Sequence, residues 1–340
     1  MSNQRRQASW YDRARDNSVT CRLCARYCSI KAGTKGFCNI RRNENGTLVT
    51  DAWGLALGLS TDPVEKKPLY HFLPGSKVLS FGTYGCNMAC SYCQNWELAR
   101  GTQVPENTKR WTAAELADIA IEQECRAIAY TYNEPVIFAE WLTAIAAEAR
   151  SAGLKNIMVT NGYVSPEARC EVFQHIDAAN VDLKAFSENF YVSLAKAHLK
   201  PVLETLLWLA GETSVWTEIT TLLIPGHNDS REELTSLCRF IARELGTDIP
   251  LHFTAFHGSY RMQHHPPTPL ATLLMARNIA LEAGLHHVYL GNIGSEEDST
   301  TTCPKCNATL ITRHPAGSPV SYMANGCCQE CGRPLAGVFA

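Results

Sequence analysis

Cysteine is the residue whose number and spacing in this chain point most directly to chemistry. The 340-residue sequence contains 15 cysteines, and 12 of them fall into three groups. We call these groups the N-terminal quartet, the central triad and the C-terminal quartet. Their members are, in that order, Cys21, Cys24, Cys28 and Cys38; Cys86, Cys90 and Cys93; and Cys303, Cys306, Cys328 and Cys331, with Cys327 adjacent. Closely spaced thiolates in a reducing compartment bind metal more often than they pair as disulfides, so we interpret all three groups as metal sites.

The central triad has the spacing C-x3-C-x2-C and follows an apolar run at residues 78–81. Three cysteines in one short loop can ligate three irons of a [4Fe–4S] cluster, which leaves the fourth iron open to an exogenous ligand. A closed structural zinc site takes four protein ligands. The triad therefore favours an open iron–sulfur site that can bind an exogenous ligand.

The C-terminal quartet consists of two C-x2-C pairs, as in the two knuckles of a zinc ribbon. Four thiolates close a tetrahedral site, and a short tail needs such a staple to be ordered. We favour zinc, although a rubredoxin-like iron centre has the same ligand set. Cys327 is not expected to be a ligand, because the Cys328–Cys331 pair already has the usual two-residue gap.

The N-terminal quartet, with the spacing C-x2-C-x3-C-x9-C, leaves two interpretations open. It could hold zinc in a docking module, or a second [4Fe–4S] cluster that passes electrons to the first. Composition does not decide between them, and we favour zinc. The remaining cysteines, Cys125, Cys170 and Cys238, lie singly in apolar periodic segments and are predicted to be buried core thiols.

Short apolar runs and helical patterns alternate from about residue 77, and these are the elements that must position the triad. Strands are predicted at 78–81, 127–132, 156–160, 179–183, 215–224, 251–256 and 287–291. Helices are predicted from the capping box Thr112-x-x-Glu115 to about 124, from Pro135 to near 153, after Pro166, and at 202–210, 229–245 and 269–284. Repeated β-then-α units imply a parallel sheet, as a full or partial barrel or a doubly wound sheet, with functional loops at the carboxyl ends of the strands.

Changes in cysteine content and in the pattern of apolar residues along the chain divide it into three parts. Residues 1–75 form a cysteine-rich metal-binding module, 76–298 the βα barrel, and 299–340 a zinc-ribbon-like module. Four histidines in or after the 251–256 strand could line a substrate pocket at the barrel mouth, although a histidine at a strand end is more often structural. They are His252, His257, His264 and His265.

Composition excludes several classes of protein. The formal net charge is −2, which with the lack of a basic and aromatic stripe argues against nucleic-acid modification. No uncharged apolar run approaches the ~18 residues of a membrane helix. Residues 1–15 carry four arginines and no following apolar stretch, so no secretory signal is visible and we expect a cytoplasmic protein.

The triad, with Tyr92 before its last cysteine, resembles the signature of radical S-adenosylmethionine (SAM) enzymes. In that superfamily the open iron of a [4Fe–4S] cluster binds the amino and carboxylate groups of SAM. One electron then cleaves SAM to a 5′-deoxyadenosyl radical, which abstracts hydrogen from a substrate. The superfamily fold is a partial (β/α)6 barrel, so the resemblance implies that fold here.

Other positions match in chain order. Residues 132–135 (Tyr-Asn-Glu-Pro) resemble the family's Gly-Gly-Glu-Pro segment, which contacts the SAM amino group through Asn133 and Glu134 here. Asn133 stands where a glycine is usual. Asn161, Asp182 and Lys184 resemble positions that contact the ribose and carboxylate of SAM. Tyr92 completes the set of residues that the resemblance implies for cofactor binding.

Residues 62–75, 93–97 and 221–226 make the chain similar to the AmmeMemoRadiSam system radical SAM proteins, which resemble pyruvate formate-lyase activating enzyme. The resemblance implies association with Memo-type and AMMECR-type proteins and an electron donor such as flavodoxin or ferredoxin. It leaves the substrate open, and a partner protein is one possibility. The extra cysteines precede the barrel, whereas glycyl-radical activases with extra clusters carry them after the triad. A rival hypothesis is a non-catalytic zinc and iron–sulfur scaffold that docks partner proteins.

Overall fold

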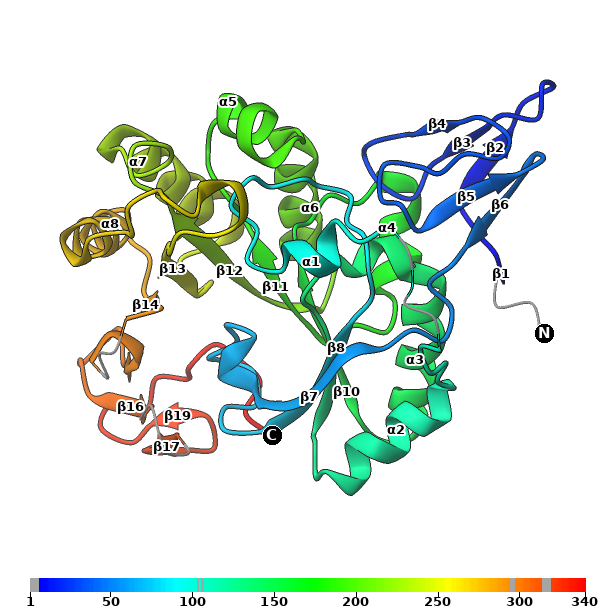
Figure 1. Cartoon of the computed structure of the whole chain (residues 1–340). Helices are drawn as coiled ribbons and strands as arrows, with labels where there is room; N and C mark the ends of the chain where they lie inside the picture. The colour runs from blue at the N-terminus through cyan, green and yellow to red at the C-terminus, as the bar shows by residue number, and fades with distance from the viewer. Residues whose placement is uncertain (1–5, 103, 105–106, 294–296, 314–318) are drawn as a thin grey trace.

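The computed structural model describes residues 6–102, 104, 107–293, 297–313 and 319–340. In this part of the chain the main sheet has eight strands in the order β14-β13-β12-β11-β10-β9-β8-β7 (Figure 1). Their bounds are β7 Leu57–Pro63, β8 Lys77–Gly82, β9 Ala127–Tyr130, β10 Lys155–Thr160, β11 Ala178–Asp182, β12 Trp216–Leu223, β13 Leu251–Ala255 and β14 Val288–Gly291. Each of the seven predicted strands is therefore present.

The strand order argues against a doubly wound sheet. Strands β8 to β14 pair in parallel, each with the next one in the chain. A doubly wound sheet would reverse its strand order at a switch point, and none occurs here. Seven parallel strands in chain order bring all their carboxyl ends to one edge of the sheet. The edge strands β7 and β14 are not paired with each other in the described structure.

Strand β7 was not predicted from the sequence. It pairs antiparallel with β8, and its sequence Leu-Gly-Leu-Ser-Thr-Asp-Pro is mostly not buried. A polar strand with a glycine and a terminal proline is typical of a sheet edge. The main sheet thus begins at Leu57, before the boundary expected at residue 75.

Six of the helices follow the predicted positions, and the short α1 and α5 were not predicted. The helices are α1 Trp96–Ala99, α2 Ala113–Glu122, α3 Ala139–Ser151, α4 Pro166–Phe173, α5 Glu188–Phe190, α6 Leu199–Glu212, α7 Arg231–Phe240 and α8 Leu270–Glu282, with α7 continued by the π-helical turn η4 Ile241–Leu245. Helix α2 starts with the predicted capping box, in which the Thr112 side chain accepts from the Glu115 N–H and the Glu115 carboxylate accepts from the Thr112 N–H. The helix expected to begin at Pro135 starts instead with a 3-10 turn, η2 Pro135–Phe138. Helices α2 and α3 flank β8 to β10, and α8 packs on β13 and β14 (Figure 1).

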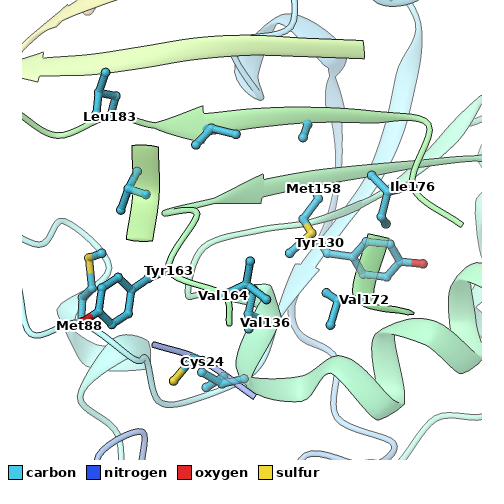
Figure 2. Close-up of a cluster of buried hydrophobic side chains, with 14 of the residues drawn as sticks. Cys24, Met88, Tyr130, Val136, Met158, Tyr163, Val164, Val172, Ile176 and Leu183 are labelled. Carbon is cyan, nitrogen blue, oxygen red and sulfur yellow. The ribbon is translucent and has the colours of Figure 1, made fainter. Parts of the chain in front are cut away.

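The N-terminal module shares its core with the barrel. It contains two small antiparallel sheets, of strands β1 Arg6–Gln7, β6 Thr47–Thr50 and β5 Arg41–Glu44, and of β2 Tyr11–Arg13, β3 Val19–Cys21 and β4 Ser29–Ile30. The backbone of Cys24 forms an isolated antiparallel β-bridge with Val164, which follows β10 in the chain. Figure 2 shows the Cys24 side chain near Val136 and Val164. Apolar residues of both parts form one continuous buried cluster. The module is therefore packed onto the barrel rather than tethered to it.

The C-terminal segment forms a small sheet structure with its own apolar centre. Its strands are β15 Thr301–Thr302, β16 Thr309–Thr312, β17 Val320–Ser321, β18 Met323–Ala324 and β19 Cys327–Cys328. The chain end then docks on the segment before β8, where Leu73 N–H donates to Val338 O (2.7 Å) and Val338 N–H donates to His71 O (2.7 Å). A buried core of Cys303, Leu310, Ile311, Cys328 and Leu335 holds this segment together.

Two of the three single cysteines are buried as predicted. Cys125 and Cys238 lie in the core, but Cys170 is exposed, so that prediction was wrong. Helix α4 buries Ala168, Val172 and Phe173, and Cys170 lies on its opposite, solvent-facing side. None of the described helices combines the length and apolar character needed to cross a membrane. Residues 1–5, which belong to the N-terminal stretch in which no secretory signal is visible, lie outside the described residues.

Candidate active site

The predicted site residues converge on one cavity at the carboxyl ends of the parallel strands. This cavity has a volume of about 340 Å³. Its lining includes every central residue that the sequence singled out: Cys86, Cys90, Cys93, Tyr92, Asn133, Glu134, Asn161, Asp182 and Lys184. They come from the loops after β8, β9, β10 and β11, which are adjacent strands. Parallel neighbours end at the same edge, so residues up to about a hundred positions apart meet there.

The triad lies on the loop between β8 and α1, and backbone hydrogen bonds hold that loop in place. Ala89 N–H donates to Ala195 O (3.0 Å) and Ser91 N–H to Leu194 O (2.9 Å), both on the single-turn π-helix η3 Tyr191–Ala195. From the other side, the Ser259 hydroxyl donates to Cys93 O (3.2 Å). The three thiols are therefore presented by a fixed backbone, as a rigid ligand set requires.

Asn133 serves as a clamp on the triad loop. Its amide nitrogen donates to Thr83 Oγ1 (3.0 Å) and Gly85 O (2.9 Å), and its amide oxygen accepts from Thr83 N–H (2.9 Å). These contacts use both ends of a buried amide. The asparagine that replaces a glycine of the family pattern thus holds the loop after β8, and its contact with SAM remains a prediction.

Glu134 is buried and accepts three hydrogen bonds. Its carboxylate receives the Thr160 hydroxyl (2.6 Å), the Asn161 N–H (2.7 Å) and the Val136 N–H (3.1 Å). Burial raises its pKa to about 7, although these hydrogen bonds act in the opposite direction. A buried carboxylate of this kind can accept a further hydrogen bond from the N–H of an amino group, which would favour its ionised form.

Asp182 and Lys184 form an ion pair on the cavity wall, with Lys184 Nζ 2.9 Å from Asp182 Oδ2. Burial opposes the charge of Lys184, but Asp182, Cys90 and Tyr92 outweigh it and hold the pKa of the ammonium well above its usual value. The cavity therefore keeps one fixed positive charge next to the triad. Such a charge can pair with a carboxylate or with anionic thiolates.

Several lining residues were not predicted from the sequence. Thr220, Thr254 and Asn292 lie at or near the ends of β12, β13 and β14, and Lys66 reaches the cavity from the turn after β7. Their position at a strand end is the signal that could have found the first three. None of the described lining residues is a histidine, so the four histidines named from the sequence do not line this cavity. His252 instead lies buried against Glu218, with Nε2 2.7 Å from Oε2.

The C-terminal quartet is assembled as a four-sulfur cage away from this cavity. All four sulfurs lie within 4.8 Å of one another, with Cys303 Sγ 3.5 Å from Cys331 Sγ and Cys306 Sγ 3.6 Å from Cys328 Sγ. A tetrahedral zinc–thiolate site places its sulfurs about 3.8 Å apart, since each Zn–S bond is about 2.3 Å. Cys327 is outside this group, as expected.

The N-terminal quartet lines a second, smaller cavity. Its four cysteines surround a volume of about 20 Å³ together with Arg26, Arg41 and Asn87. Within each of the three predicted cysteine groups, the structure thus brings the members to a common site. Which metal each one holds stays a prediction.

Comparison with known proteins agrees with this geometry. Residues 81–238 match the model of the radical SAM superfamily. The chain is 41% identical over 309 residues to an uncharacterized protein of Methanocaldococcus jannaschii, with 91% of this chain and 92% of that protein covered. It is 24% identical over 230 residues to a protein of the same organism named "Putative glycyl-radical enzyme activating enzyme", with 66% and 82% covered.

A solved structure shares the fold. A radical SAM methyltransferase from Sphaerobacter thermophilus superposes with a TM-score of 0.50 at 16% sequence identity, covering 64% of this chain and 67% of that one. The family match spans the triad and the lining residues from Cys86 to Leu222, and it defines a radical SAM protein. The chain belongs to the radical SAM superfamily, and it is similar to a protein named for activation of a glycyl-radical enzyme. Membership implies reductive cleavage of SAM with an iron–sulfur cluster.

Proposed function

We propose that this protein is a radical SAM enzyme that generates a 5′-deoxyadenosyl radical in the 340 Å³ cavity and uses it to abstract hydrogen from a substrate. One observation carries the proposal: the three triad thiols and the six predicted SAM-contacting residues line the same cavity. Three thiols on one fixed loop fit a [4Fe–4S] cluster with one open iron. When bound, the cluster supplies the electron that cleaves SAM, which is chemistry of the cofactor rather than of the protein.

The residues of the chain bind and orient SAM. The Glu134 carboxylate receives the SAM amino group, and Lys184 offers its charge to the SAM carboxylate. Asn161, whose amide donates to Asn87 Oδ1 (2.8 Å), and Asp182 lie where the ribose is expected. Tyr92 lines the cavity and is buried against Phe190, with ring centroids 5.7 Å apart.

The size of the cavity bears on the substrate. Pockets for small molecules span roughly 300–1,000 Å³, so this one is near the lower limit and SAM would occupy most of it. A substrate group must then enter from the open side of the cavity. Next to the lining residue Asn95 in the chain, exposed Trp96 stacks on Tyr260 with ring centroids 5.2 Å apart. A residue of a partner protein can enter in this way. The similarity to the protein named for activation of a glycyl-radical enzyme supports a protein substrate.

The proposal extends to the partners and to the flanking metal. As a partial (β/α)6 barrel of the AmmeMemoRadiSam type, the protein would receive electrons from a flavodoxin or ferredoxin and act with Memo-type or AMMECR-type proteins in the cytoplasm. The close sulfur spacing of the C-terminal quartet supports zinc there.

Anaerobic SAM cleavage tests this function. The reconstituted and reduced protein should convert SAM to 5′-deoxyadenosine, and Cys90→Ala should abolish the conversion. Cys327→Ala is the matched control, because it removes a thiol outside the three metal sites. If the Cys90→Ala protein cleaves SAM as well as the parent, the assignment is wrong. If neither protein cleaves SAM although both hold metal, the chain acts as a scaffold. If the parent protein does cleave SAM, deuterium transfer from labelled cell extracts into 5′-deoxyadenosine would identify the substrate.

A further inference from the structure

The N-terminal quartet differs in geometry from the C-terminal one. Among the described residues, the C-terminal quartet is the one group of cysteines, histidines and carboxylates whose ligand atoms all lie within 4.8 Å of one another. The N-terminal cysteines surround a common cavity, yet their sulfurs do not form such a group. Zinc would require them about 3.8 Å apart. A cluster spreads its cysteines more widely, because each thiolate binds a different iron at a separate corner.

The cavity that these four cysteines line is consistent with this wider spacing. Its volume is about 20 Å³, which is room for about one water. Sulfurs closed on a single zinc ion would leave no such void between them.

The buried cation Arg41 lines this cavity and has one N–H donor without a hydrogen-bond partner. Arg41 is 1% exposed and lines the cavity, and its two terminal nitrogens bind Glu140 and Ser9 O. Its Nε–H has no hydrogen-bond partner. An unpaired buried N–H is costly unless an acceptor completes it, and the sulfur of a thiolate-ligated cluster is such an acceptor.

The quartet also lies directly against the triad loop. Asn87 lines the quartet cavity, is the residue after Cys86, and accepts through its side chain from Asn161, which lines the catalytic cavity. The guanidinium of Arg26 donates to the Asn87 carbonyl. A side chain at Gly85 would come within 2.0 Å of Cys38 O. One loop thus separates the two sets of cysteines.

We propose that the N-terminal quartet holds a second, fully ligated [4Fe–4S] cluster that passes single electrons to the cluster of the triad. Four cysteines leave no open iron, so this site binds no SAM and transfers electrons only. In each transfer the reduced N-terminal cluster loses one electron and the oxidised triad cluster gains it, with no bond made or broken. Cys21, Cys24 and Cys38 are buried and Cys28 is half-buried, which leaves one edge for a protein electron donor. The transfer step rests on the proposed function, whereas the metal assignment does not.

Metal and sulfide content of a triple variant tests the assignment. Cys86→Ala, Cys90→Ala and Cys93→Ala together remove the triad, and the anaerobically reconstituted variant should retain about four irons and about four acid-labile sulfides per chain. The reduced variant should still give an electron paramagnetic resonance signal of a [4Fe–4S] cluster. Zinc without labile sulfide in this variant would overturn the proposal, even if the parent enzyme cleaves SAM. The sulfide requirement also separates a cluster from a single iron in the C-terminal quartet.

Electron transfer is tested with Cys24→Ala against Cys327→Ala. With reduced flavodoxin, Cys24→Ala should cleave SAM at a rate about tenfold or more below its own rate with a small chemical reductant, which reaches the triad cluster directly. Cys327→Ala should match the parent with both reductants. An equal rate with flavodoxin would refute the transfer step. If Cys24→Ala is misfolded by circular dichroism, the triple variant still decides the metal assignment.

Discussion

At the residue scale, the site depends on side chains whose partners are distant in sequence. The triad and Glu134 could be recognised from the sequence because their spacing and types match a known pattern. The role of Asn133 could not, because its partners Thr83 and Gly85 lie about fifty positions earlier and come near it only through the pairing of β8 with β9. The reason why asparagine stands at position 133, where glycine is usual, therefore becomes clear only from the folded structure.

Glu134 makes stability depend on pH with a definite sign. Its pKa rises from an ordinary value of 4.5 to about 7 in the folded protein, so between these values the folded state binds more protons than the unfolded state. This group therefore lowers the free energy of unfolding as pH rises through that window, by about 3 kcal/mol in full. Unfolding by denaturant from pH 5 to 8 should show this decline in the parent. Glu134→Gln, which cannot ionise, should lack that component, and identical pH slopes in the two proteins would contradict the account.

At the element scale, the parallel strands were predictable to within a few residues because each is a short stretch rich in apolar or β-branched residues. Strand β7 and the two small N-terminal sheets were not, because their strands are short or polar and depend on pairing for their order. The first turn after Pro135 is a 3-10 turn capped by the Glu134 side chain, which accepts from Val136 N–H. The periodicity that predicts a helix does not distinguish that turn from an α-helical one.

Gly85 fixes how the triad loop meets the N-terminal module. Its φ is +84°, and a Cβ there would lie 2.0 Å from Cys38 O, a backbone atom that cannot move aside cheaply. We expect Gly85→Ala to lower the free energy of unfolding by about 2 kcal/mol or more and to reduce the bound iron. Gly153→Ala is the control, with φ +78° and no atom within 4 Å of the added Cβ. Denaturant unfolding and iron analysis compare the two. Equal losses would show that backbone strain alone matters and that the contact with Cys38 does not.

At the scale of the whole molecule, the boundary expected from composition does not separate independent cores. The N-terminal module and the barrel bury one apolar cluster, and the segment before β8 docks the chain end. Buried His71 also links these parts, with Nδ1 2.8 Å from Ala336 O and Nε2 2.6 Å from the Tyr289 hydroxyl. Long-range packing of this kind leaves no periodic signal in the sequence.

The C-terminal quartet should stabilise this docking. Cys306→Ser removes an exposed ligand of the cage, so we expect it to lose one bound metal ion per chain and to lower the Tm by several degrees. Cys327→Ser is the control next to the cage and should change neither quantity. Metal analysis and thermal unfolding measure both effects. Retained metal with an unchanged Tm in Cys306→Ser would show that the four sulfurs are not a metal cage.

The central claim is that SAM binds directly to a cluster held by the triad. Electron–nuclear double resonance on the reduced protein tests it most directly, with SAM labelled with ¹⁵N at its amino group. We predict a ¹⁵N hyperfine coupling that shows the amino nitrogen bound to iron, present in the parent and in Cys327→Ala and absent in Cys90→Ala. A reduced cluster in the parent protein without any such coupling at saturating SAM would contradict the account.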